Sequence, residues 1–288
     1  MKHSQEPARP GTLYLVATPI GNLEDISFRA LNTLKTVDVV AAEDTRRTRK
    51  LLSYYDISAR LISYREHNKV FQGRKLLEML QQGQSIAVCS DAGMPVVSDP
   101  GEDFVRLCIE NGVPVTVIPG PNAALCALVL SGLSANTFLY LGFITRKAKK
   151  KAQFIESLKD LPHTLIFYES PGRVVQLLKD LAGILGDRKA CVAREISKIH
   201  EEFQRGPLSE LIEKMDGTGC KGEFVVVVEG AGPGPGRDYF DPEEAAREVQ
   251  LLEAQGTPRK KAIKEVANRL HTSKRAVYRL FIEENSRD

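Results

Sequence analysis

Three short loops rich in glycine and proline each follow an apolar, strand-like run of the sequence. They span residues 18–23 (TPIGNL), 90–101 (SDAGMPVVSDPG) and 119–124 (PGPNAA). Small residues let the backbone approach a ligand closely, and ligands of open α/β sheets bind beyond the carboxyl ends of the strands. One such loop is most often a plain turn. Three of them at one edge of a sheet predict a small-molecule site.

Two polar stretches follow neighbouring strand-like runs and could face the same site. They span residues 43–48 (EDTRRT) and 64–68 (YREHN). Their acidic, basic and imidazole groups suit substrate recognition or proton transfer, with Glu43, Asp44 and His67 as the candidate catalytic groups. The start of an N-capped helix accounts equally well for EDTRRT. A lone histidine in a loop is also more often a surface residue, so both interpretations stay open.

Several common chemistries are disfavoured by what these loops lack. The first loop holds one glycine, Gly21, where a dinucleotide fingerprint needs three, and no GxxxxGK[ST] phosphate-binding motif occurs. Nicotinamide cofactors and ATP are therefore not expected. Asp91 and Asp99 could ligate a metal, but aspartates in such turns more often bind their own backbone, and we expect no metal. The five cysteines form no CxxC pair, which is typical of reduced thiols in a cytosolic protein.

The elements that must position these loops alternate between strands and helices. In the first half, strand-like runs at residues 12–18, 37–42, 60–63, 85–89 and 113–118 are separated by helix-like segments. Strands that are apolar on both faces predict a covered, largely parallel sheet in an α/β domain. The pattern starts afresh near Thr137, with strands near residues 138–143, 164–168, 190–193 and 224–229. We therefore expect α/β domains at residues 1–135 and 136–232.

The last part of the chain differs in composition. Residues 230–236 (GAGPGPG) predict a linker. Three helix-like segments follow, the last two separated by the short turn 271–273, which is typical of a helix-turn-helix. Residues 257–288 carry nine Lys/Arg and four Asp/Glu, a net charge of +5, whereas the preceding 256 residues carry −2. A basic helical extension over residues 233–288 predicts a polyanionic partner, and a small helical cap on the second domain is the alternative.

The composition excludes several other classes of protein. Hydrophobic residues make up 42% of the 288 residues and charged residues 27%, as in ordinary globular proteins. The longest apolar runs reach about half of the ~20 residues that a membrane helix needs. The polar N-terminus lacks the apolar core of a secretory signal. We therefore expect a cytoplasmic protein that does not bind membranes.

Seven motifs, in order over roughly residues 12–230, resemble the tetrapyrrole methylase superfamily of S-adenosylmethionine-dependent enzymes. The motifs are VATPIGNLEDI, AAEDTRRT, YREHN, SDAGMPVVSDPG, PGPNA, FYESPGR and KGEFVVVVEG. They are most similar to the bacterial family that methylates small-subunit ribosomal RNA. The resemblance implies two α/β domains with S-adenosylmethionine in the cleft between them, and a homodimer. It also implies 2′-O-methylation of a cytidine ribose in the decoding region of 16S rRNA, with 16S rRNA or the small ribosomal subunit as partner.

The resemblance also implies which residues would act. The cofactor contacts carried over from the motifs are Pro19, Ile20, Ser90, Asp91, Ala92, Gly93, Met94, Asn122, Ala123, Phe143, Tyr168, Glu169, Ala193, Arg194, Gly222 and Glu223. Met94 and Asn122 stand where many relatives have a small residue such as Thr, Ser or Cys. The basic residues expected to contact rRNA are Arg46, Arg47, Arg65, Lys260, Lys261, Lys264, Arg269, Lys274, Arg275 and Arg279.

Two other functions are compatible with parts of this pattern. A methylase of the same superfamily that acts on a corrin or porphyrin precursor would share the loops, but it would not need the basic C-terminal helices. A non-enzymatic ribosome-assembly factor would bind RNA through the same loops without methyl transfer. The polar groups of Glu43, Asp44 and His67 favour an enzyme.

Overall fold

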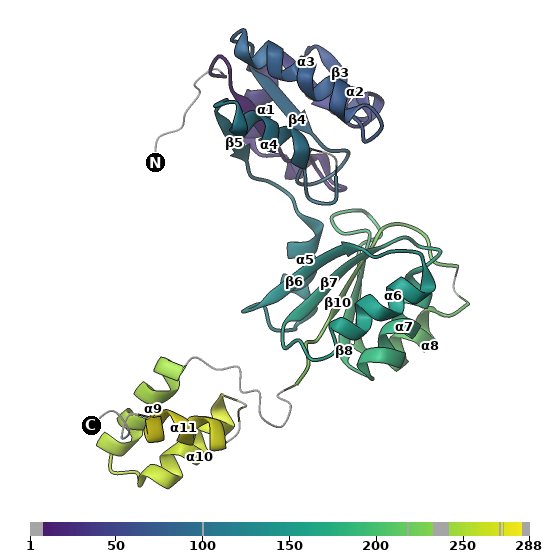
Figure 1. Ribbon diagram of the computed structural model, residues 1–288. Coiled ribbons are helices and arrows are strands. Elements are labelled where there is room, and N and C mark those ends of the chain that lie inside the picture. Colours follow the sequence, from purple (N-terminus) through teal and green to yellow (C-terminus); the bar gives the residue numbers. More distant parts are fainter. Residues whose placement is uncertain are drawn as a thin grey trace.

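The computed structural model describes residues 8–99, 101–217, 219–232, 242–270, 272 and 274–283, apart from the side chains of Pro242, Ala276, Arg279, Ile282 and Glu283. Two five-stranded sheets, each covered by helices, are followed by three further helices (Figure 1). Residues 233–241, which include the last four residues of the expected linker 230–236, the N-terminal residues 1–7, and His271 and Ser273 of the expected turn lie outside the described residues. In the part of the chain that is described, no helix is long and apolar enough to cross a membrane.

The first sheet is parallel throughout. Its strands are β1 (Leu13–Val16), β2 (Val39–Ala42), β3 (Leu61–Ser63), β4 (Ile86–Cys89) and β5 (Val115–Ile118). They lie in the order β3-β2-β4-β1-β5. The connections carry the short η1 (Leu23–Asp25), α1 (Phe28–Thr36), α2 (Thr45–Tyr54), α3 (Lys69–Gln81) and α4 (Glu102–Glu110). The prediction of a covered parallel sheet is confirmed.

Burial on both faces explains the continuous apolar strands. In β1, Leu13 packs into one core with Leu76 and Phe104, whereas Val16 packs into the other with Leu34 and Leu52. Successive side chains of a strand point to opposite faces. A strand between two helical layers must therefore be apolar at every position, and all four residues of both β2 and β4 are buried.

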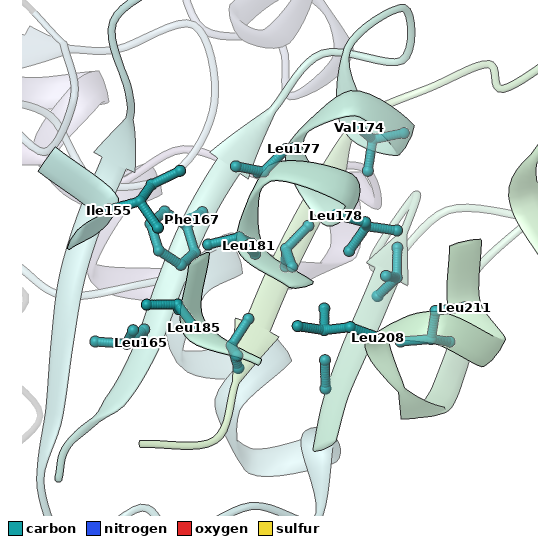
Figure 2. Packing of buried hydrophobic residues seen from close by; sticks show 14 of the residues in the cluster. Ile155, Leu165, Phe167, Val174, Leu177, Leu178, Leu181, Leu185, Leu208 and Leu211 are labelled. Atoms are coloured by element: carbon teal, nitrogen blue, oxygen red, sulfur yellow. The ribbon is translucent and has the colours of Figure 1, made fainter. Parts of the chain in front are cut away.

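The second sheet is mixed. Its strands are β6 (Phe138–Phe143), β7 (Thr164–Glu169), β8 (Lys189–Arg194), β9 (Glu202–Pro207) and β10 (Phe224–Val228), in the order β6-β7-β10-β8-β9. β6 pairs with β7 in parallel, and the other pairs are antiparallel. The helices α6 (Ala148–Ser157), α7 (Val174–Leu185) and α8 (Leu208–Met215) cover one face. Figure 2 shows Leu177, Leu178 and Leu181 of α7 packed toward Phe167 and Leu208 in this core.

Helix α5 (Ala123–Ser131) covers the other face of the second sheet. Its buried residues Ala124, Ala127 and Leu128 pack with Ile166 and Val225. By packing, α5 therefore belongs with the second sheet, although it precedes the expected boundary at 135/136, which stays a prediction. The chain crosses from one sheet to the other at the third glycine-rich loop, immediately before α5.

The C-terminal helices α9 (Pro242–Ala254), α10 (Arg259–Arg269) and α11 (Lys274–Glu283) pack around one apolar core. Val249 of α9, Ile263 and Val266 of α10, and Phe281 of α11 are buried in it. The expected helical extension is confirmed.

Candidate active site between the two sheets

The glycine-rich loops meet because parallel strands end at the same edge of the first sheet. β1 and β4 are neighbours, and the loops that follow them are joined by a two-way bridge. Thr18 N donates to Gly93 O (2.9 Å), and Gly93 N donates to Thr18 O (3.0 Å). Ser90 is buried beneath this bridge, and its hydroxyl donates to Gly93 O at 3.1 Å. The first two predicted loops therefore form one connected backbone surface.

The second sheet completes the site. Phe143 ends β6, Tyr168 and Glu169 end β7, and Gly222 and Glu223 precede β10. Together with the loops of the first sheet they line a cavity of about 360 Å³, a size suited to a small-molecule ligand. Residues predicted to bind the cofactor that line this cavity are Ile20, Asp91, Ala92, Gly93, Met94, Asn122, Ala123, Phe143, Tyr168, Glu169, Gly222 and Glu223.

Four of the predicted cofactor residues lie elsewhere. Pro19 and Ser90 line an adjoining pocket beside α2, which shares Arg47 and Asp91 with the cavity. Ala193 is fully buried in β8 among the residues that pack against α5. Arg194 donates from Nε to Lys221 O at 2.8 Å and pairs with Glu202. In this structure these four residues lie beside or behind the cavity and are not part of its lining.

Asn122 stands where many relatives have a small residue such as Ser or Thr, and it still caps the N-terminus of α5. Its side-chain oxygen accepts from Leu125 N at 3.0 Å and caps the N-terminus of α5, which is the bond that Ser or Thr makes at this position. Met94, the other departure from the family pattern, lines the cavity.

One wall of the cavity is aromatic. The ring of Tyr168 meets those of Phe143 and Tyr140 edge-on, with ring centroids 5.6 and 5.2 Å apart. Tyr168 OH accepts from Ala124 N at 3.1 Å, which ties β7 to the first turn of α5. Burial raises the pKa of Tyr168, so its hydroxyl stays protonated. Such a wall suits the flat, apolar face of an aromatic base.

Two glycines are required by the geometry of the walls. Gly93 has φ +81°, and a Cβ there would lie 3.3 Å from the side chain of Ile20. Gly222 has φ +99°, and a Cβ there would lie 2.6 Å from Glu195 Oε1. Glu195 itself accepts from Glu223 N (2.8 Å) and pairs with Lys198 (2.9 Å). Both loops therefore present bare backbone to the cavity.

The cavity is acidic. Its lining holds the carboxyl groups of Asp91, Asp99, Glu169 and Glu223, and the guanidinium of Arg47. Arg47 lies 3.5 Å from Asp91, and the buried Glu169 pairs with Arg173 at 2.5 Å. Glu223 pairs with Lys198 at 3.0 Å, so Asp99 is the lining carboxyl group for which no ion pair is seen among the described residues.

Asp99 has the most perturbed carboxyl group in this lining. Burial, with smaller contributions from the negative charges of Glu43 and Asp91, raises its pKa to about 7. Asp99 is absent from the predicted cofactor and catalytic sets, because the sequence shows it only as the second aspartate of a turn. A carboxyl group that titrates near neutral pH inside a cavity is a candidate proton acceptor.

The loop before Asp99 is strained. Val96 has φ +76° and Ser98 has φ +64°, a region that is unfavourable for residues other than glycine and most of all for β-branched ones. Ser98 Oγ lies 2.7 Å from Tyr140 OH, which ties this loop to the second sheet. Strain held in place by such contacts is typical of functional sites.

The three predicted catalytic groups lie in different environments. Asp44 caps α2 by accepting from Arg46 N at 2.9 Å, and this bond lowers its pKa. Burial of Glu43 raises its pKa, and the negative charge of Asp91 raises it further. His67 is exposed in the turn before α3 and does not line the cavity. The structure thus brings Glu43 toward the site and leaves His67 on the surface.

The predicted RNA-contacting arginines of the first sheet lie around α2. Arg46 is exposed on α2, and Arg47 reaches into the cavity. Arg65 Nε donates to Glu43 O at 2.8 Å, so it also fixes the loop after β2. Arg65 therefore positions the loop that carries Glu43, and Arg47 pairs with Asp91.

On the C-terminal helices, Lys260, Lys261, Lys264, Lys274 and Arg275 are exposed. Arg269 pairs with Glu248 at 2.5 Å, so its charge is partly compensated. The side chain of Arg279 lies outside the described residues. Among the described residues, no cluster of three or more His, Cys, Asp or Glu could hold a metal ion.

Close relatives of the chain are known. Ribosomal RNA small subunit methyltransferase I of Halalkalibacterium halodurans is 47% identical over 281 residues, which cover 95% of this chain and 96% of that protein. The protein of the same name from Bacillus subtilis is 46% identical over 275 residues, or 93% of each chain.

Solved structures share the fold. Cobalt precorrin-4 methyltransferase has a TM-score of 0.58 at 15% identity, covering 76% of this chain and 95% of that one. Uroporphyrin-III C-methyltransferase from Thermus thermophilus, solved with S-adenosyl homocysteine, has a TM-score of 0.55 at 22% identity, covering 75% of this chain and 96% of that one. Residues 12–212 match the Tetrapyrrole (Corrin/Porphyrin) Methylases. The chain belongs to the tetrapyrrole methylase family and, within it, to the group of the ribosomal RNA small subunit methyltransferases I.

Proposed function

We propose that this protein is an S-adenosylmethionine-dependent rRNA (cytidine-2′-O-)-methyltransferase that acts in the decoding region of 16S rRNA. The observation that carries the proposal is the acidic, aromatic-walled cavity formed by loops of both sheets, in a chain whose relatives are named for methylation of small-subunit rRNA. The finer choice of a cytidine ribose rests on the family resemblance.

The lining of the cavity fits the proposed cofactor. Bare backbone at Gly93 and Gly222 leaves room for a ligand, and Phe143 and Tyr168 offer an apolar face for an adenine ring. Among the carboxyl groups of the lining, that of Asp99 has no ion pair in the described residues, and it suits the positive charge of the sulfonium or the amino group. When bound, S-adenosylmethionine supplies an activated methyl group.

The protein has to position the ribose and accept its proton. Holding the 2′-oxygen in line with the methyl group is worth ~7–11 kcal/mol in favourable cases. As the oxygen–methyl bond forms, the hydroxyl proton must leave. We assign Asp99 as the group that accepts it, because Asp99 lines the cavity and its pKa of about 7 matches neutral pH. Glu43 then serves as the neighbouring charge that helps to raise this pKa.

We also propose that the protein is cytoplasmic and forms a homodimer. β5 is an edge strand of the first sheet, and Arg29 of α1 donates to Val117 O on it at 2.9 Å. Beside it, Phe28 is 88% exposed and Val117 is 43% exposed. An open edge strand next to exposed apolar side chains favours contact with a second copy.

A methyl-transfer assay tests the proposal. The full chain is given tritiated S-adenosylmethionine with unmethylated small ribosomal subunits and, separately, with naked 16S rRNA. We expect label at one decoding-region nucleotide whose 3′ linkage resists alkali, as a 2′-O-methyl ribose requires. Label that appears only with an added uroporphyrinogen-type acceptor, or RNA binding without any label, would overturn it.

A further inference from the structure

A cluster of basic side chains lies directly after a cavity-lining residue of the second sheet. β6 ends at Phe143, which lines the cavity. Three residues further on begins the rim cluster, which we define as Arg146, Lys147, Lys149 and Lys150. All four side chains are exposed. Three residues of chain span at most ~11 Å, so the rim cluster starts beside the cavity.

The charges of the rim cluster are not neutralised within the described part of the chain. The next basic residue, Lys151, pairs with Asp180 of α7. No such ion pair is seen for Arg146, Lys147, Lys149 or Lys150 among the described residues. The rim cluster therefore presents an open positive surface.

The position of the rim cluster is also unfavourable for the helix that carries it. Lys147 is the N-cap of α6, and Lys149 and Lys150 lie in its first turn, with no side-chain cap. The N-terminus of a helix carries partial positive charge, so cations there oppose the helix dipole. Helix stability therefore does not explain the lysines at these positions, whereas binding of an anionic partner explains them.

The acidic lining of the cavity explains why a positive rim is needed. The cavity lining holds four carboxyl groups and the guanidinium of Arg47, which is already paired with Asp91, so the lining offers little attraction for a phosphate group. An RNA strand whose ribose reaches the cavity must keep its own phosphates outside. The rim cluster offers cations just outside the cavity. The lysines of α10 and α11 lie on helices that pack around a separate core.

We propose that the rim cluster binds the RNA phosphates next to the nucleotide whose ribose enters the cavity. This inference rests on the proposed function, because it takes RNA as the methyl acceptor. The rim cluster would hold the strand near the reacting ribose, and the C-terminal helices would add affinity at other phosphates. Like all phosphate contacts, those of the rim cluster carry no sequence information themselves.

The test compares two full-length variants that each lose four positive charges. The rim variant is Arg146→Gln/Lys147→Gln/Lys149→Gln/Lys150→Gln. The control variant is Lys35→Gln/Arg60→Gln/Arg74→Gln/Lys75→Gln. Its residues are exposed and do not line the cavity. Lys35 and Arg60 precede β2 and β3 and so lie toward the opposite edge of the first sheet.

The readout is affinity for 16S rRNA over a range of KCl concentrations. For single-stranded RNA, each phosphate contact contributes about 0.7 to the slope of log K against log salt, so the rim variant should lose about 3. The control variant should keep the wild-type slope. Binding of S-adenosylmethionine, measured by calorimetry, should be unchanged in both, and the Tm of the rim variant should be equal to or above that of the wild type.

The outcomes separate the two proposals. If the wild type methylates rRNA and the rim variant keeps its salt slope, the inference is overturned while the proposed function stands. An equal loss of slope in both variants would also overturn it, because net charge alone would then explain the effect. If the wild type binds rRNA through the rim cluster but transfers no methyl group, the proposed function fails, and the inference fails with it because RNA binding by the rim cluster then has no link to a reacting ribose.

Discussion

At the scale of single residues, the proposed chemistry depends on carboxyl groups that lie far apart in the sequence. Glu43, Asp91 and Asp99 follow two different strands. Because β2 and β4 are neighbours, these groups gather at one edge of the sheet, where burial and the neighbouring negative charges raise the pKa values of Glu43 and Asp99. Val96 and Ser98, in the loop just before Asp99, have positive φ.

Replacement of Asp99 by asparagine tests its role as the proton acceptor. Asp99 must be ionised to accept a proton, so the single-turnover rate of the wild type should rise as pH increases through about 7. The Asp99→Asn variant should be slower by about 10²–10⁴-fold and should lose this pH dependence. Calorimetry with S-adenosylmethionine controls for intact cofactor binding, and an unchanged rate would remove Asp99 from the mechanism.

The same Asp99→Asn variant should show the cost of this residue in stability. The folded-state pKa is raised, so the folded protein binds the proton more tightly than the unfolded chain does. The contribution of Asp99 to stability is therefore fully present below about pH 4 and is lost as pH rises through about 7. Asparagine should raise the Tm at pH 8 by a few degrees, at about 2–4 °C per kcal/mol, and change it little at pH 4. A lower Tm at pH 8 would contradict the burial of this charge.

At the scale of elements, the start of β10 is fixed by the hairpin between β8 and β9. Glu195 N donates to Glu223 O at 3.0 Å, and the Glu195 side chain accepts from Glu223 N. Lys198 pairs with both carboxylates. This network holds Gly222 close to the Glu195 side chain, and Gly222 lines the cavity at this point.

Two glycine-to-alanine substitutions should therefore have opposite effects. Gly222→Ala adds a Cβ at positive φ, 2.6 Å from a fixed carboxylate oxygen, so both the Tm and the affinity for S-adenosylmethionine should fall. Gly183 lies in α7 with open space around it, and alanine there should stabilise the fold by roughly 0.5–1 kcal/mol without changing cofactor affinity. Thermal unfolding and calorimetry measure both. Wild-type affinity in Gly222→Ala would show that the loop before β10 does not contact the cofactor.

At the scale of the whole molecule, the basic C-terminal helices form a unit that is separate from the candidate site. The cavity is formed by residues up to Val225, whereas α9, α10 and α11 have their own core. The exposed side chains of Lys260, Lys261, Lys264, Lys274 and Arg275 lie on α10 and α11, and we expect them to bind phosphates.

Removal of residues 233–288 tests this division and the expected boundary at 232/233. The truncated chain should bind S-adenosylmethionine with wild-type affinity, because the cavity lining is intact. Its affinity for 16S rRNA should fall and depend less steeply on salt. Circular dichroism confirms folding. Equal loss of both affinities in a folded truncation would show that the helical extension supports the cavity.

The sequence by itself determined most of the fold and most of the loops of the site. Apolar runs such as residues 85–89, separated by helical periodicity, predict covered strands because burial on both faces demands them. Glycine-rich turns after those strands mark the site, since parallel strands end together. These are local signals, so they can be read without knowing which strands are neighbours.

Only the tertiary structure decided which of these residues meet. It placed α5 on the second sheet, left His67 on the surface, and set Arg194 behind the wall rather than in the cavity. It also raised the pKa of Asp99 and brought the rim cluster beside the opening. Burial, electrostatic coupling and the order of strands in a sheet depend on contacts between residues that are distant in the chain. Residue type and spacing alone therefore do not determine them.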